Sequence, residues 1–296
     1  MKTVQLVLCI VMLSFVTISQ LNAQSSSEQD STGLPGDNFS LQGALMMFKK
    51  ASSPEEFEKL LNTQDNHVNN LDLNGDGDID YIRVVGTMDK DVHAFALQVP
   101  VSETENQDIA VIELEKTGEA TAILQIIGDE EIYGEQTIVE PDGGGEDDED
   151  VDDNGGGGRP HYAGYDSYYA PRVAVNVWFW PSVRLVYAPT YRVWVSPWRW
   201  RVYPVWWHPW RPVAWRVFHP FRVRYHTGFA VVRTHRVVHA HRIYSPRRVT
   251  SVTVRTRHQA SVKNYRVSKT TTIKAKSGGT KVKATKKMTR VGKKKR

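Results

Sequence analysis

The sequence predicts an α+β fold, in which two N-terminal helices pack on an antiparallel β-meander and an acidic linker leads to a low-complexity basic region. Two segments with helical spacing of apolar residues come first, and five runs with β-branched or alternating character follow them. The composition then changes abruptly after residue 158. We therefore expect residues 37–140 to form one compact domain, since about 100 residues can bury a modest single core.

The two expected helices have recognisable start signals. The first is predicted to begin after a cap at Asp37 or Asn38 and to run to Phe48, with its apolar residues on one face. The second begins with Ser53 as the cap residue and Pro54 at the first helical position, and acidic residues follow at the positive end of the helix dipole.

The expected strands are short and closely spaced. Breaks of hairpin length at 88–91 and 116–119 predict that neighbouring strands pair antiparallel. The five runs cover residues 79–87, 92–101, 109–115, 120–127 and 132–139.

Residues 1–23 resemble a secretory signal peptide. Lys2 forms a short positive region, residues 4–18 are apolar, and Ala23 offers a small residue for cleavage. The alternative is an uncleaved N-terminal anchor. Export would place the protein in the periplasm, at the outer-membrane surface or outside the cell.

Cleavage would remove Cys9, the single cysteine of the chain. Disulfides then could not stabilise the exported protein, although its compartment would permit them, and a bound metal ion is a plausible substitute. Residues 24–36 are polar and rich in serine, and we expect them to be disordered.

Charge divides the chain into two halves. Residues 1–158 carry 32 Asp and Glu against 7 Lys and Arg, a net of −25, whereas residues 159–296 carry 1 against 31, a net of +30. Such segregation indicates electrostatic partners or association between the halves. Residues 141–158 combine acids with seven glycines and are predicted to be a flexible acidic linker.

Residues 159–262 form a basic region with a strong compositional bias. All nine tryptophans lie between Trp178 and Trp215, among arginines, valines and regularly placed prolines. The prolines exclude long central strands, so we expect short strands and extended segments. Residues 263–296 are rich in Lys, Thr, Ser and Gly and are predicted to be a disordered basic tail.

The segment 72–80 has the spacing of a calcium loop. A hard dication needs several oxygens at close range, and alternate residues of a tight loop can supply them, with a glycine, Gly77, at the sixth position where the chain turns. The expected ligands are Asp72, Asn74, Asp76, Asp78 through its backbone carbonyl, and Asp80, directly or through water.

This loop resembles that of an EF-hand up to Asp80 and then departs from it. The twelfth position, which supplies a bidentate Glu in the EF-hand, is Arg83, and the following residues are typical of a strand. The pattern is more similar to the calcium loops of integrin-type β-propeller repeats, although one copy cannot build a propeller. The resemblance implies a weakly bound, structural calcium ion. The alternative is a polar Asx/Gly turn without metal.

Arginine beside tryptophan and tyrosine suits planar anionic or sugar partners. Anionic polysaccharide, lipopolysaccharide, a membrane surface and nucleic acid all fit the basic half, and export favours the anions of the cell envelope. Two other interpretations stay open. In one, the tryptophans and valines form a β-rich core whose solvated face is the arginines; in the other, the acidic linker folds back on the basic half.

Neither a transition-metal site nor an active site is predicted. His235, His239 and His241 lie close together, and two of them would share a strand face, but histidines scattered through a basic segment are usually surface residues. No nucleophile, zinc-protease or phosphate-loop motif is present, and no small-molecule substrate is inferred.

An acidic domain with one calcium loop, followed by a Trp/Arg/Pro-rich basic region, resembles uncharacterised exported proteins of Gram-negative bacteria. We expect a calcium-binding, non-enzymatic envelope protein with an adhesion or scaffolding role, whose basic half holds anionic glycan or lipid. The alternative is a periplasmic or secreted protein that binds nucleic acid or another polyanion, and a hydrolase is a more distant third.

Overall fold

A computed structural model describes residues 31–143 and 174–277 of the chain. The expected signal peptide, most of the acidic linker and the last part of the basic tail lie outside these residues.

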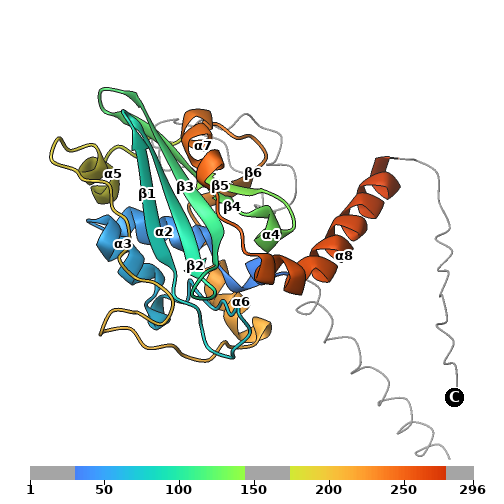
Figure 1. Ribbon diagram of the computed structural model, residues 1–296. Helices are drawn as coiled ribbons and strands as arrows, with labels where there is room; N and C mark the ends of the chain where they lie inside the picture. The colour runs from blue at the N-terminus through green and yellow to red at the C-terminus, as the bar shows by residue number, and fades with distance from the viewer. Residues whose placement is uncertain (1–30, 144–173, 278–296) are drawn as a thin grey trace, which may run out of the picture.

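An antiparallel sheet organises the fold and confirms the α+β class. Its six strands follow one another in sequence order, each hydrogen-bonded to the next (Figure 1). The strands are β1 (Arg83–Asp89), β2 (Val92–Pro100), β3 (Asn106–Gly118), β4 (Thr121–Gly128), β5 (Thr137–Pro141) and β6 (Phe229–Val232).

Helices cover one face of this sheet. They are preceded by a short 3-10 helix, η1 (Pro35–Asn38), and comprise α2 (Leu41–Lys50) and α3 (Pro54–Leu61). The cap of α2 is Ser40, whose Oγ accepts from the N–H of Gly43, and not Asp37 or Asn38. In α3, Ser53 Oγ accepts from the N–H of Glu56.

Residues 31–36 are ordered where the sequence predicts disorder. The carboxylate of Asp37 accepts hydrogen bonds from the hydroxyls of Ser31 and Thr32 and from the N–H of Gly33, at 2.8, 2.9 and 2.9 Å. A buried carboxylate needs hydrogen-bond donors. Because residues 31–33 supply them to Asp37, these residues are held in place.

The main core lies between these helices and the sheet. Phe48 packs against Phe57 and Phe95, with ring centroids 5.2 and 5.4 Å apart. Residues of the basic half complete the core, among them Val177, Val183, Phe229 and Val254. The change of composition near residue 158 is therefore not a boundary in the fold, because β6 also pairs with β5 and covers its edge.

The basic half is more helical than the sequence predicts. Within the described residues it contributes one strand of the sheet, β6, and otherwise short helices, one long helix and extended segments. Its helices are α5 (Pro181–Val186), α6 (Trp215–Val223), α7 (Val238–Tyr244), η4 (Ser245–Arg247) and α8 (Val252–Ser277). Proline fits the first turn of a helix, where its missing N–H costs nothing, and α5 begins in this way.

The expected basic tail also starts later than residue 263, since α8 continues to Ser277 and extends away from the sheet (Figure 1). Within the described ranges, none of the helices combines the length and the apolar character that crossing a membrane requires.

The second face of the sheet is covered by α7 and its flanking loops. A small apolar cluster lies there, which includes Ala94, Val111, Ile127 and Tyr244. Around it the sheet carries buried acidic residues, which are Asp108, Glu113, Glu115 and Glu140. Two further short helices are described: the 3-10 helix η2 (Gln64–Asn66) and α4 (Glu130–Tyr133).

Candidate functional site

The loop from Asp72 to Asp80 is closed by hydrogen bonds to its first carboxylate. Asp72 Oδ1 accepts from the N–H of Gly75 at 2.6 Å and of Asp76 at 3.2 Å, and Oδ2 accepts from the N–H of Gly77 at 3.0 Å. Gly75 and Gly77 have φ angles of 72° and 89°, a region that glycine adopts without steric cost. The first expected ligand therefore points into the loop.

Three other expected ligands contact one another. The Nδ2 of Asn74 donates to Asp76 Oδ2 at 2.9 Å and to Asp80 Oδ1 at 3.1 Å. Asp80 is 5% exposed, and its other oxygen accepts from the N–H of Leu73. Asp78 lies at the exposed side of the loop and donates its N–H to Asp76 Oδ1 at 3.0 Å.

Burial and neighbouring charges perturb the ionisation of the last acid of the loop. Burial, together with the charges of Asp72 and Asp76, raises the pKa of Asp80 to about 7. A dication among these oxygens would relieve the same repulsion, and hard oxygen donors suit calcium.

The twelfth position supplies no ligand. Arg83 is the first residue of β1, and its guanidinium bonds the side chain of Gln98 and the carbonyl oxygen of Trp198, the latter at 3.1 Å. A strand follows the loop where the EF-hand has a helix, so the loop lacks the bidentate carboxylate that strengthens calcium binding there.

The loop at residues 72–80 is joined to the aromatic half. The N–H of Ile79 donates to the carbonyl oxygen of Trp210 at 2.8 Å. The ring of Tyr81 lies 5.0 Å from that of Trp207 and 5.7 Å from that of Tyr203, measured between centroids. Its hydroxyl donates to Glu58 Oε1 at 2.8 Å. Aromatic residues of the basic half thus pack directly on the residues that end the loop.

Residues 198–206, which we call the aromatic turn, project from this contact. The N–H and C=O groups of Arg199 and Val202 bond each other at 3.2 and 2.8 Å and close the turn. Val205 and Trp206 are 95% and 44% exposed, so the turn presents apolar and cationic side chains together. The ammonium of Lys59 lies 5.6 Å from the centre of the Trp206 ring.

A cavity of about 460 Å³ separates the aromatic turn from α3. Trp198 and Trp206 line it together with Glu55, Glu56 and Glu58. Lys59 also lines the cavity, so its walls carry both signs of charge. Arg199 and Arg201 of the aromatic turn are exposed.

Three histidines of the basic half, His235, His239 and His241, meet acids of the sheet at its second face. His235 and His241 bond the carboxylate of Glu113, whereas His239 bonds Glu115 at 3.1 Å. In the described part of the chain, Glu113, His235 and His241 form a group whose ligand atoms lie within 4.8 Å of one another.

Glu113 was not among the residues that the sequence singled out. Two of the three histidines were expected to share a strand face, but His235 lies in a loop and His239 and His241 lie in α7. A carboxylate inside a predicted strand is the signal that could have found it, because a charged side chain in a buried strand needs a partner.

Comparisons with protein-family models, with curated proteins and with solved structures find no match for this chain.

Proposed function

We propose that this chain is an exported, non-enzymatic calcium-binding protein of the cell envelope, whose aromatic, basic surface holds anionic glycan or lipid. In this proposal residues 1–23 are a signal peptide and residues 141–158 an acidic linker, while Asp72, Asn74, Asp76, Asp78 and Asp80 surround the ion.

The contact between the calcium loop and the aromatic half carries the proposal. The N–H of Ile79 lies at the eighth position of the loop and bonds Trp210, and the ring of Tyr81 supports Tyr203 and Trp207. An ion that fixes the loop would therefore also fix the base of the aromatic turn. Calcium has a structural role here, in keeping with weak binding in the range of about 10⁻⁴ to 10⁻³ M.

Calcium binding is tested by thermal unfolding and by titration calorimetry. With a Kd of about 0.5 mM, 5 mM calcium should stabilise the mature protein by about 1.4 kcal/mol. Asp76→Asn should remove most of this gain, because it takes one carboxylate from the site. Asp89→Asn is the matched control, since this exposed acid lies in the next turn. A protein that shows neither binding heat nor a thermal shift in 5 mM calcium has no such site.

Anion binding is tested by retention on immobilised heparin and lipopolysaccharide across a salt gradient. The double variant Arg199→Ala, Arg201→Ala should elute at lower salt, and its binding should depend less steeply on salt concentration. Arg192→Ala, an exposed arginine outside the turn, is the control. If both variants and the parent elute at the same salt concentration, the aromatic turn is not the anion-binding surface.

The alternative partner is nucleic acid, favoured by the same exposed arginines beside aromatic rings. Competition separates the two. DNA that displaces the protein from lipopolysaccharide at equal charge concentration supports the alternative, whereas resistance to DNA supports the envelope anion.

A further inference from the structure

Glu113 occupies the middle of the sheet with its carboxylate removed from water. It lies in β3, opposite Ala94 of β2 and Gln125 of β4, and its side chain is 0% exposed. Burying a carboxylate is costly unless charge or hydrogen-bond partners compensate it. The groups that face Glu113 therefore decide what this site can bind.

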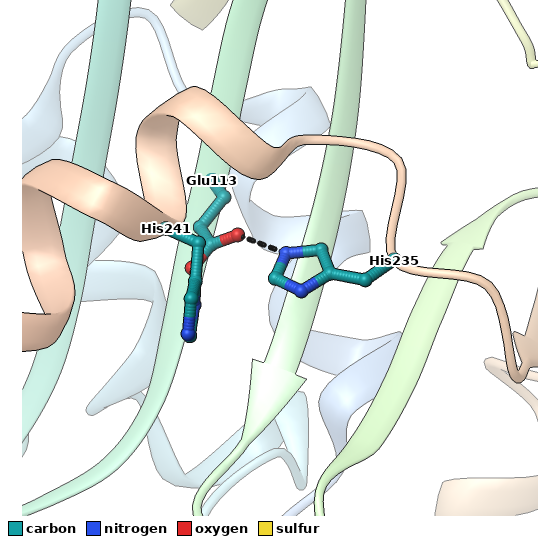
Figure 2. A group of neighbouring side chains, drawn as sticks. All are labelled: Glu113, His235 and His241. Carbon is teal, nitrogen blue, oxygen red and sulfur yellow. Dashed lines mark hydrogen bonds and ion pairs between the residues drawn. The ribbon is translucent and has the colours of Figure 1, made fainter.

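Two imidazoles face it from different elements. His235, in the loop after β6, places Nε2 2.6 Å from Oε2, and His241, in α7, places Nδ1 2.7 Å from Oε1. The two rings are 4.7 Å apart between centroids and nearly perpendicular, at 78°. Figure 2 shows both rings beside the carboxylate, which they approach from two directions.

Other buried acids that meet the basic half are compensated in another way. Asp129 pairs with Arg248, and Glu140 pairs with Arg236. Glu115 accepts two backbone N–H groups, from His239 and Ala240, at 2.6 and 2.9 Å. Arginines or backbone N–H groups thus compensate these acids, whereas Glu113 faces two imidazoles.

We propose that Glu113, His235 and His241 form a binding site for a divalent transition metal of the zinc type. Two imidazole nitrogens and one carboxylate oxygen are a donor set that such ions prefer, and calcium does not share this preference for nitrogen. Three protein ligands leave a position for water or another ligand, and the partly exposed rings let an ion enter.

Metal binding requires only small movements. Bonds of about 2.0–2.2 Å around a tetrahedral ion separate the ligand atoms by about 3.3–3.5 Å. This is more than the two present contacts of 2.6 and 2.7 Å and lies within the 4.8 Å that bounds the whole group. His235 and His241 are 21% and 31% exposed at their side chains and lie in a loop and a short helix, so their rings can move outward. Glu113 stays fixed in the central strand. Each imidazole that carries an extra proton releases it as the metal binds.

The competing interpretation is a purely structural ion pair, in which protonated histidines neutralise Glu113. It predicts no metal affinity. The site is independent of the proposed calcium loop, because the two have no ligand in common.

Titration of the full mature chain with Zn²⁺, in 5 mM calcium, distinguishes these interpretations. We expect one zinc ion per chain with the affinity lowered at least about tenfold by His235→Gln and by His241→Gln. His239→Gln, on the same helix but bonded to Glu115, is the matched control and should retain the parent affinity. Circular dichroism and thermal unfolding verify that each variant is folded.

Cobalt provides a readout that needs no variant. Co²⁺ bound by nitrogen and oxygen in a four- or five-coordinate site gives visible absorption bands that Zn²⁺ should abolish stoichiometrically. The proposal is overturned if the parent binds no zinc, if His239→Gln weakens binding as much as His241→Gln, or if Asp76→Asn in the calcium loop removes the zinc site.

Discussion

His93 gives the most direct test of how the basic half packs on the sheet. This residue of β2 is 2% exposed, and its ring lies 4.9 Å from that of Tyr187 and 5.7 Å from that of Tyr191. Both tyrosines belong to the basic half. Burial beneath them lowers the pKa of His93 from 6.5 to about 4.

The sign of the pH effect follows from this shift. Between pH 4 and 6.5 the unfolded chain binds a proton at His93 that the folded chain excludes, so the free energy of unfolding decreases as the pH falls through this window. A shift from 6.5 to about 4 costs about 2 kcal/mol between pH 7 and pH 5, and about 3.4 kcal/mol in total below pH 4.

Urea unfolding at pH 7, 6 and 5 measures this loss in the parent and in His93→Phe. Phenylalanine keeps an aromatic ring against the two tyrosines and cannot titrate, so the variant should lose about 2 kcal/mol less than the parent over this range. Equal losses in the two proteins would refute the reasoning. So would a His93 pKa near 6.5 in an NMR titration, because the ring would then be solvated and the tyrosines could not cover it.

Two further predictions concern residues that fix the sheet and the loop. Arg248→Ala leaves Asp129, whose side chain is 4% exposed, without its bidentate partner and should lower the free energy of unfolding by about 3 kcal/mol. Arg248→Lys should retain part of this stability. Chemical unfolding measures both variants, and equal costs would contradict the bidentate geometry. The added methyl group of Gly77→Ala would meet no neighbouring atom within 4 Å, so the expected loss of about 1–2 kcal/mol in the free energy of unfolding comes only from the positive φ angle. Thermal unfolding without calcium measures this loss. An unchanged melting temperature would show that the loop does not need this conformation.

Among the residues that the structure describes, several acids of the first half pair with arginines of the second half. Glu140 of β5 bonds Arg236, and Asp129, in the turn after β4, bonds Arg248; both arginines flank α7 in the chain. A link between the acidic and basic halves was one of the interpretations of the sequence, with the linker as the acidic partner. In the described residues, acids of the sheet and of the turn after β4 make these contacts.

Local signals in the sequence determined the α+β class. Apolar periodicity, the Ser53–Pro54 helix start and short polar breaks act between residues close in the chain, so a reader of the sequence can evaluate them. The tight turns of the loop at residues 72–80 follow in the same way from Asp72 and Gly77, which are five residues apart.

Tertiary structure alone decided where the basic half lies and what its histidines meet. Glu113 is 122 residues from His235 and 128 from His241, and no periodicity relates such positions. Nor could composition show that β6 joins the sheet, because its four residues become a strand by pairing with β5. Pairing and burial between distant segments, which local patterns do not encode, therefore placed the carboxylate and the two imidazoles at one site.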